Sequence, residues 1–205
     1  MLKNLLHELG GIAIFLFSVF KTFLSTRGNL RPIVGQIAYV SFRSLSTVVF
    51  AGVFVGAILV LQFNLILVKY DAQSFLGGLN TSSLIREIGP LIISFLLAGK
   101  IGAFTAAELG TMRVTEQIDA IECLGANPIQ YLVVPRVFGI VISSLILLAL
   151  GLMIGIVGSM TIATLFCGIN PLQYIMSVPR FTEPFTVFGG MLKSFVYGTI
   201  VATVS

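Results

Sequence analysis

Charge is scarce in this chain. Asp, Glu, Lys and Arg make up 10% of its 205 residues, whereas hydrophobic residues make up 57%. A soluble domain usually carries about 25% charged residues. A helix crosses the hydrocarbon core of a bilayer with runs of about twenty apolar residues, and this chain has several such runs. The composition therefore excludes a soluble protein and predicts an all-α polytopic membrane protein.

The sequence also lacks the motifs of common catalytic and metal sites. Its two cysteines, Cys123 and Cys167, have neither CxxC nor metal-type spacing, and its one histidine, His7, has no cluster of carboxylates or cysteines beside it. The Gly99-Lys100 pair lacks the other residues of a Walker A motif, and neither GxSxG nor HExxH occurs. We therefore expect no catalytic residue, no metal and no cofactor. The net charge of +4 is modest and spread along the chain, which speaks against nucleic acid as a partner.

Four apolar stretches are long enough to cross a membrane. Within a single domain covering 1–205, we predict transmembrane helices at 44–68, 88–107, 132–166 and 185–205. Residues 1–26 repeat apolar side chains at helical spacing, but their continuous apolar part is short, so we expect a helix lying in the interface. Residues 71–83 and 167–184, which contain glycine or proline, are predicted to be loops.

Small residues within the spans indicate close helix packing. Gly52 and Gly56 form a small-xxx-small face in the first span, and Gly99 and Gly102 leave one side of the second span small. We expect these faces to pack against another helix, either in this chain or in a second subunit.

Polar groups inside the spans need partners. Asn64 is expected to bond to another helix or to line a cavity. A lysine inside a bilayer costs about 3 kcal/mol on insertion scales, so Lys100 should reach the polar segment that follows, where Glu108 is a candidate partner. Arg86 and Glu87 are adjacent and are expected to satisfy each other in part.

Residues 108–125 form a polar segment between the second and third predicted spans. Gly110 is predicted to end the preceding helix, Thr115 to cap a short helix, Gly125 to end that helix, and Asn127-Pro128 to start the next. On the short helix, apolar and acidic residues lie on opposite sides: Val114, Ile118, Ile121 and Leu124 against Glu116, Asp119 and Glu122. The acidic side either docks on a partner or is merely solvated, and composition alone does not separate the two.

The distribution of basic residues predicts the orientation. Six Lys and Arg flank the span ends on the N-terminal side and in the polar segment, against three in the other two loops. Since basic residues are enriched in cytoplasmic loops, the N-terminus and the polar segment are predicted to be cytoplasmic. The C-terminus then returns to the same side. It follows the last span without a charged flank, as expected for a truncated protein.

Several motifs resemble those of the MlaE-type permeases, which are membrane subunits of ABC transporters that work with Mce-domain proteins. The resemblance begins near Gly28 and is strongest in Arg86-Glu87-Ile88-Gly89-Pro90, Ala98-Gly99-Lys100-Ile101-Gly102, the run from Ala107 to Ala120, and Tyr131 to Arg136. Lys100 stands where the family more often has arginine.

The resemblance implies a homodimer of permeases, each with an interfacial helix and about five membrane helices, that moves phospholipid between the bacterial inner membrane and an Mce-protein assembly. A cytoplasmic ABC ATPase would hydrolyse ATP, and a small STAS-type protein is a further candidate partner. A plastid envelope is the alternative location. The residues implied to couple to the ATPase are Glu108, Arg113, Thr115, Glu116, Gln117, Asp119 and Glu122.

Two other functions remain open from the sequence. An ion-coupled secondary transporter should show two related halves with paired broken helices and titratable groups at mid-membrane, and no such repeat is evident. A non-transporting, truncated membrane scaffold is the third alternative. Lipid-contacting residues are not identified, because the walls of an apolar cavity resemble ordinary packing surfaces.

Overall fold

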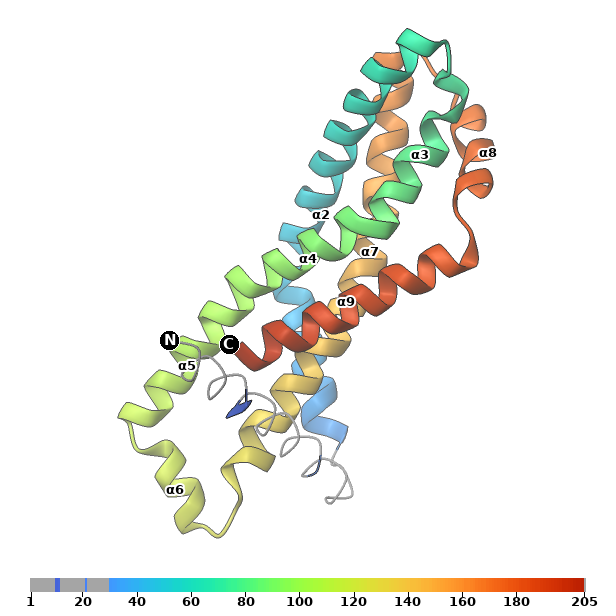
Figure 1. Ribbon diagram of the computed structural model, residues 1–205. Helices are drawn as coiled ribbons and strands as arrows, with labels where there is room; N and C mark the ends of the chain where they lie inside the picture. Colours follow the sequence, from blue (N-terminus) through green and yellow to red (C-terminus); the bar gives the residue numbers. More distant parts are fainter. Residues whose placement is uncertain (1–9, 12–20, 22–29, 205) are drawn as a thin grey trace, which may run out of the picture.

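The computed structural model describes residues 10–11, 21 and 30–204, and this part of the chain is helical without strands (Figure 1). Four of its helices are long and apolar enough to cross a membrane: Arg31–Tyr70, Gln73–Val114, Ile129–Cys167 and Pro184–Val204. The prediction of an all-α, multi-pass membrane protein is therefore confirmed. The predicted interfacial helix at 1–26 lies outside the described residues, apart from Gly10, Gly11 and Lys21.

The elements follow one another with short connections. In chain order they are α2 Leu30–Leu67, η1 Val68–Tyr70, η2 Gln73–Phe75, α3 Leu76–Ser83, η3 Leu84–Ile88, α4 Gly89–Leu97, η4 Ala98–Gly102, α5 Ala103–Val114, α6 Gln117–Cys123, η5 Ile129–Val133, α7 Val134–Cys167, α8 Pro171–Phe181 and α9 Pro184–Val204. The elements η3, η4 and η5 are single π-helical turns, so the second span is one long helix interrupted twice by π turns.

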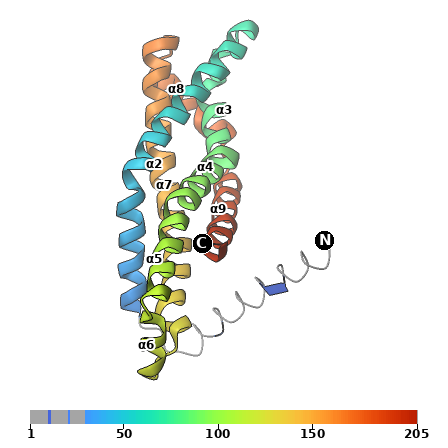
Figure 2. The ribbon, with the colours of Figure 1, turned by 90° about the vertical axis from the view of Figure 1, so that its left-hand side faces the viewer.

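Helices α2 and α7 lie side by side along most of their length (Figures 1 and 2). Glycine sets their separation. A methyl group on Gly56 would lie 2.6 Å from Ser159 Oγ and closer still to the carbonyl oxygen of Gly155, and one on Gly52 would lie 3.0 Å from the carbonyl oxygen of Gly151. The two backbones therefore meet where neither helix has room for a side chain.

The loop predicted at 71–83 is wrong, because the helix of the second span begins at Gln73. Only Asp71 and Ala72 separate it from η1, with Asp71 in the left-handed conformation at φ 52°. Asn64, in the first span, accepts a hydrogen bond from Gln73 Nε2 at 3.0 Å, as expected of an amide that joins two helices. Gly77, taken as a loop residue, instead lies where α8 packs against α3.

The loop predicted at 167–184 is also wrong over most of its length, because it contains α8. Asn170 caps this helix by accepting a hydrogen bond from the Leu172 N–H at 2.9 Å, and Pro171 takes the first helical position, where its missing N–H costs nothing. Tyr174 points into α3, is 1% exposed, and accepts a hydrogen bond from Asn80 Nδ2 at 2.9 Å. Pro171 therefore starts a helix rather than marking a loop.

Helix α9 completes the bundle by packing against α7 and α4 (Figure 1). Ser144 of α7 and Ser194 of α9 each donate to the carbonyl oxygen of the other at 3.3 Å. Gly190 meets the backbone of Ile85, and Gly198 meets Ser144. Small residues thus bring α9 close to both neighbours.

Candidate functional site

The polar segment forms an arm that projects from the bundle. We define the arm as residues 103–133, which comprise α5, α6 and η5. None of residues 106–133 is buried, and α6 lies at the end of the molecule farthest from α8 (Figures 1 and 2). The predicted end of the preceding helix at Gly110 is wrong, since α5 continues through Gly110 to Val114. The arm is therefore a helical hairpin rather than a loop with one short helix.

The tip of the arm reverses the chain at Glu116. Thr115 does not cap α6 as predicted, because its hydroxyl donates backward to the Thr111 carbonyl oxygen at 2.8 Å. Glu116 adopts the left-handed conformation at φ 55°, and α6 starts at the next residue. Gly125 turns the chain again at φ 75°, in agreement with its predicted role at the end of the helix. The Asn127 side chain accepts a hydrogen bond from the Ile129 N–H at 3.0 Å, which confirms the predicted helix start there.

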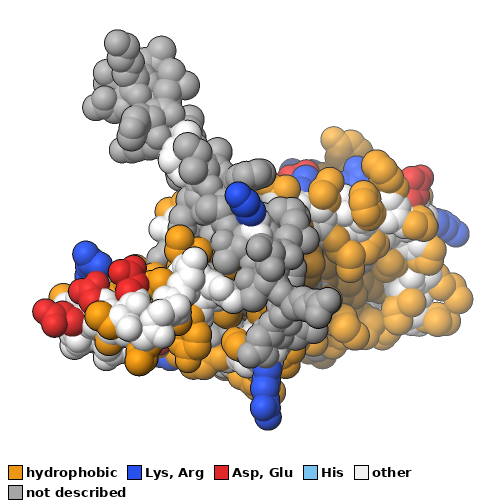
Figure 3. Space-filling model, turned by 90° about the horizontal axis from the view of Figure 1, so that it is seen from below, with side chains coloured by type: hydrophobic (Ala, Val, Ile, Leu, Met, Phe, Trp, Pro, Cys, Tyr) orange, Lys and Arg blue, Asp and Glu red, His pale blue; other side chains and the backbone are white. Residues whose placement is uncertain are grey.

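Acidic side chains gather on this arm, as the space-filling view shows at one end of the molecule (Figure 3). Arg113 and Asp119 form an ion pair at 3.5 Å in which both side chains are exposed, so it contributes little stability. Glu116 and Glu122 are exposed and make no ion pair with any residue that the structure describes. The tip of the arm therefore presents carboxylates that are free to meet a partner.

Large apolar side chains accompany these acids. Val114 is 84% exposed and Leu124 is 85% exposed, while Ile118 and Ile121 are half-buried. Exposed apolar groups rimmed by charge are typical of surfaces that bind another protein or a membrane. The arm thus carries both the charge and the apolar surface that a docking element needs.

Glu108 differs from the other predicted coupling residues. It lies at the base of the arm, where its Oε2 accepts from Arg136 Nη2 at 2.7 Å, and Arg136 is 12% exposed. Lys100, expected to pair with Glu108, instead donates to the Arg43 carbonyl oxygen at 2.6 Å and to Thr47 Oγ1 at 2.9 Å, both on α2. The prediction for Lys100 is wrong, because its side chain turns toward α2 rather than toward the arm.

A second group of charges lies between the second span and α9. Glu87 pairs with Lys193 of α9 at 2.6 Å, and Lys193 also donates to the Arg86 carbonyl oxygen at 2.9 Å. The Arg86 guanidinium donates to Thr186 Oγ1 at 3.5 Å. The expected Arg86–Glu87 contact is wrong, since adjacent residues on a helix do not face each other. The sequence places Lys193 inside a predicted span, and that position is the one signal that it needs a partner.

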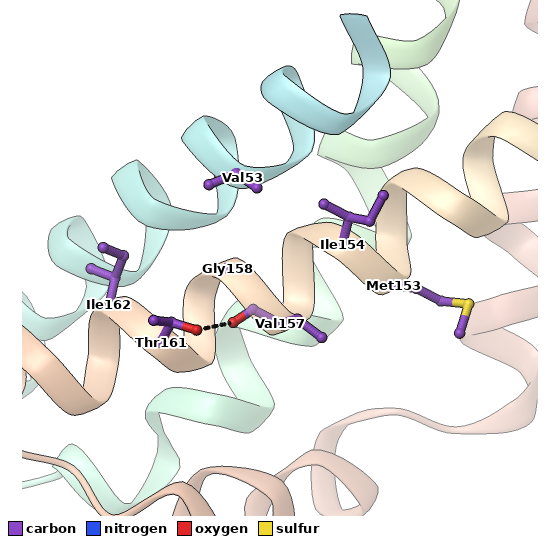
Figure 4. Close-up of a pocket in the computed structure, with 7 residues that line it drawn as sticks. All are labelled: Val53, Met153, Ile154, Val157, Gly158, Thr161 and Ile162. Atoms are coloured by element: carbon purple, nitrogen blue, oxygen red, sulfur yellow. Dashed lines mark hydrogen bonds between the residues drawn. The ribbon is translucent and has the colours of Figure 1, made fainter. Parts of the chain in front are cut away.

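Apolar grooves open on the sides of the bundle. The first, of about 420 Å³, lies between α2 and α7 and is lined by Val53, Met153, Ile154, Val157, Gly158, Thr161 and Ile162 (Figure 4). Its one hydroxyl, on Thr161, donates to the Val157 carbonyl oxygen of its own helix at 2.9 Å. This lining suits hydrocarbon and offers nothing to a charged headgroup.

The second groove, of about 360 Å³, separates the second span from α9. It is lined by Ala98, Gly102, Ala103, Ala106, Ile200, Val201 and Val204. A methyl group on Gly99 would meet no atom within 4 Å, so no segment that the structure describes packs against this position. Gly102 is buried beside it.

Fold and site together define a multi-pass, all-helical membrane protein with a charged arm at one end. The chain matches the Permease MlaE family over residues 33–205 and belongs to that family. It is 38% identical to a probable ABC transporter permease protein of Synechocystis over 91% of this chain and 71% of that protein. It is 34% identical to a protein of the same description from Rickettsia conorii, over 97% of this chain and 77% of that protein. It is 27% identical to the intermembrane phospholipid transport system permease protein MlaE of Haemophilus influenzae, over 97% of this chain and 77% of that protein.

Proposed function

We propose that this chain is the permease subunit of an ABC-type transporter that moves phospholipid or a related lipid between the bacterial inner membrane and an Mce-protein assembly. The observation that carries the proposal is the unburied, acidic arm at one end of an apolar helical bundle. Family membership supports the permease role, and the description of the Haemophilus influenzae relative supports phospholipid as the cargo. ATP hydrolysis takes place in a separate ATPase subunit.

The arm is the part that an ATPase would grip. Its tip offers exposed side chains, and these are Arg113, Thr115, Glu116, Gln117, Asp119 and Glu122. Exposed Val114 and Leu124 supply the apolar contacts of such an interface. The arm and the N-terminus are cytoplasmic in this proposal, which agrees with the distribution of basic residues.

A second copy of the chain completes the transporter. The groove beside Gly99 and Gly102 is apolar and lined by small residues, as helix contacts between membrane subunits often are. Acyl chains of the lipid need only apolar walls, and the groove between α2 and α7 supplies them. The Mce-domain protein and a STAS-type protein are proposed as further subunits on the basis of the resemblance alone.

Co-purification with the ATPase tests the proposal. The double variant Glu116→Lys, Asp119→Lys is expected to abolish co-purification, because two acidic contacts become repulsive, while leaving membrane insertion intact. The matched control is Asp71→Lys, Glu183→Lys, which makes the same change in net charge away from the arm and should co-purify normally. Unchanged co-purification of the arm variant would refute docking. An ion-coupled transporter would move its substrate without any ATPase. A scaffold would remain in the membrane without one and would transport nothing.

The two native cysteines test the orientation. Cys123 is exposed on the arm, and Cys167 ends α7 at the opposite end of the molecule. A membrane-impermeant thiol reagent should label Cys123 in inverted membrane vesicles and not in intact cells, with Cys123→Ser as the control. Labelling of Cys123 from outside intact cells would contradict a cytoplasmic arm.

A further inference from the structure

The base of the arm is held by one ion pair. Glu108 belongs to α5, the descending helix of the arm, and Arg136 belongs to the first turn of α7, to which the arm returns. Their side chains meet at 2.7 Å, and this is the shorter and less exposed of the two ion pairs that the arm makes with described residues. Residues 106–133 contribute no buried side chain. This ion pair therefore links α5 to α7 at the base of the arm.

Glu108 compensates the positive charge of Arg136. The Arg136 side chain is 12% exposed, and its Nη1 atom is buried without a hydrogen-bond partner among the residues that the structure describes, whereas the Glu108 side chain is 46% exposed. A charge-assisted hydrogen bond at this distance is strong, and a partly buried cation that loses its only carboxylate partner is left uncompensated. Arg136 is thus the more rigidly held member of the pair, and Glu108 attaches the arm to it.

One to two turns before Glu108, the same helix is tied to α2 by Arg43. Its carbonyl oxygen accepts from Lys100, and its guanidinium lies over the ring of Phe104 at 4.1 Å from the centroid. The second span is therefore attached to α2 at Lys100 and Phe104, where the arm begins, and to α7 at Glu108. A displacement of the tip, which lies about 12 Å beyond Glu108 at 1.5 Å per residue, acts on both long helices through these ties.

We propose that Glu108 and Arg136 form a clamp that sets the angle of the arm against α7, so that Glu108 is a positioning residue rather than a contact of the ATPase. The part of this inference that concerns transport rests on the proposed function, whereas the clamp itself is a property of the chain alone. Without the clamp, the arm stays able to dock but passes its motion to α7 less completely.

A distance measurement in the purified chain tests the clamp directly. Spin labels are placed on native Cys123 and on a cysteine introduced as Met153→Cys, which is 66% exposed on α7, in a Cys167→Ser background. Glu108→Gln and Arg136→Gln should each broaden the distribution of distances between the labels in lipid nanodiscs. Glu108→Asp and the exchange Glu108→Arg, Arg136→Glu should restore a narrow distribution, because each retains an opposite-charge pair. Asp119→Asn, which removes the exposed Arg113–Asp119 ion pair, should leave the distribution of distances narrow.

Two functional readouts complete the test. Glu108→Gln should still co-purify with the ATPase. It should lower lipid transfer about tenfold, which is within the range for residues that couple two sites. The exchange Glu108→Arg, Arg136→Glu should recover most of the lost transfer. A narrow distribution in Glu108→Gln together with lost co-purification would overturn the clamp and return Glu108 to the docking surface. Failure of both Glu108→Asp and the exchange to narrow the distribution would overturn it as well. Broadening in a chain that binds no ATPase would support the clamp and refute only the proposed function.

Discussion

Replacing Gly56 with alanine would place a methyl group against the backbone of α7. In the structure that methyl would lie 2.6 Å from Ser159 Oγ and closer still to the Gly155 carbonyl oxygen. Comfortable contact between such atoms needs about 3.5 Å, so α2 and α7 would have to separate by about 1 Å. The serine hydroxyl is also held, because it donates to the Gly155 carbonyl oxygen at 2.7 Å. Neither obstacle has a flexible end that could move aside.

The expected cost follows from these contacts. Overpacking a close contact usually costs about 1–3 kcal/mol, and a rigid backbone neighbour favours the upper half of that range. Alanine in place of glycine within a helix returns about 0.5–1 kcal/mol. The free energy of unfolding of Gly56→Ala should therefore fall by about 1–2 kcal/mol, which lowers the thermal midpoint of a chain of this size by about 2–8 °C.

The assay is thermal unfolding in detergent, followed by the helical signal in circular dichroism. Gly35→Ala is the matched control in the same helix, because a methyl group there meets no atom within 4 Å, and its midpoint should stay equal or rise. If Gly56→Ala were as stable as Gly35→Ala, the close approach of α2 and α7 described above would be refuted.

Two further substitutions probe contacts that join distant segments. Lys100→Ala removes both hydrogen bonds to α2, and since a bond from a charged donor contributes about 1.5–3 kcal/mol, the thermal midpoint should fall; an unchanged midpoint would contradict the tie. Tyr174→Phe leaves the Asn80 amide without its acceptor, so α8 should become more sensitive to protease at neutral pH, and equal digestion would contradict the packing of α8 on α3. Burial raises the pKa of the Tyr174 hydroxyl above its ordinary 10.0, so stability that is complete below pH 10 is lost as the pH rises through that higher pKa, in the wild type and not in Tyr174→Phe.

Some sequence signals predicted the structure correctly because they depend only on interactions between neighbouring residues. Asn127-Pro128 starts a helix in the structure since a capping side chain and a proline act within one turn. Gly125 turns the chain for the same kind of reason, because a left-handed residue without a side chain is unstrained. The amphipathic pattern of the arm likewise depends only on helical periodicity.

Other local signals were overruled by contacts between distant segments. Gly77 and Pro171 carry the residue preferences of loops, yet Gly77 lies at the interface of α3 with α8 and Pro171 begins α8. The glycine is there because the backbone of Tyr174 approaches it, and the proline is there because a helix must begin. The role of Gly77 becomes visible only when the two helices are placed together, whereas Asn170-Pro171 is the same local start signal as Asn127-Pro128.

The sequence alone determined that the chain is helical, that it crosses a membrane several times, and that its charge concentrates in one segment between spans, because apolar length and helical periodicity are properties of consecutive residues. Only the tertiary structure decided which charges meet: Lys100 with α2, Glu87 with Lys193, and Glu108 with Arg136. A charged side chain inside or beside a bilayer must find a partner, but the direction in which it turns depends on which helix packs beside it. That neighbour is set by the packing of segments far apart in the chain.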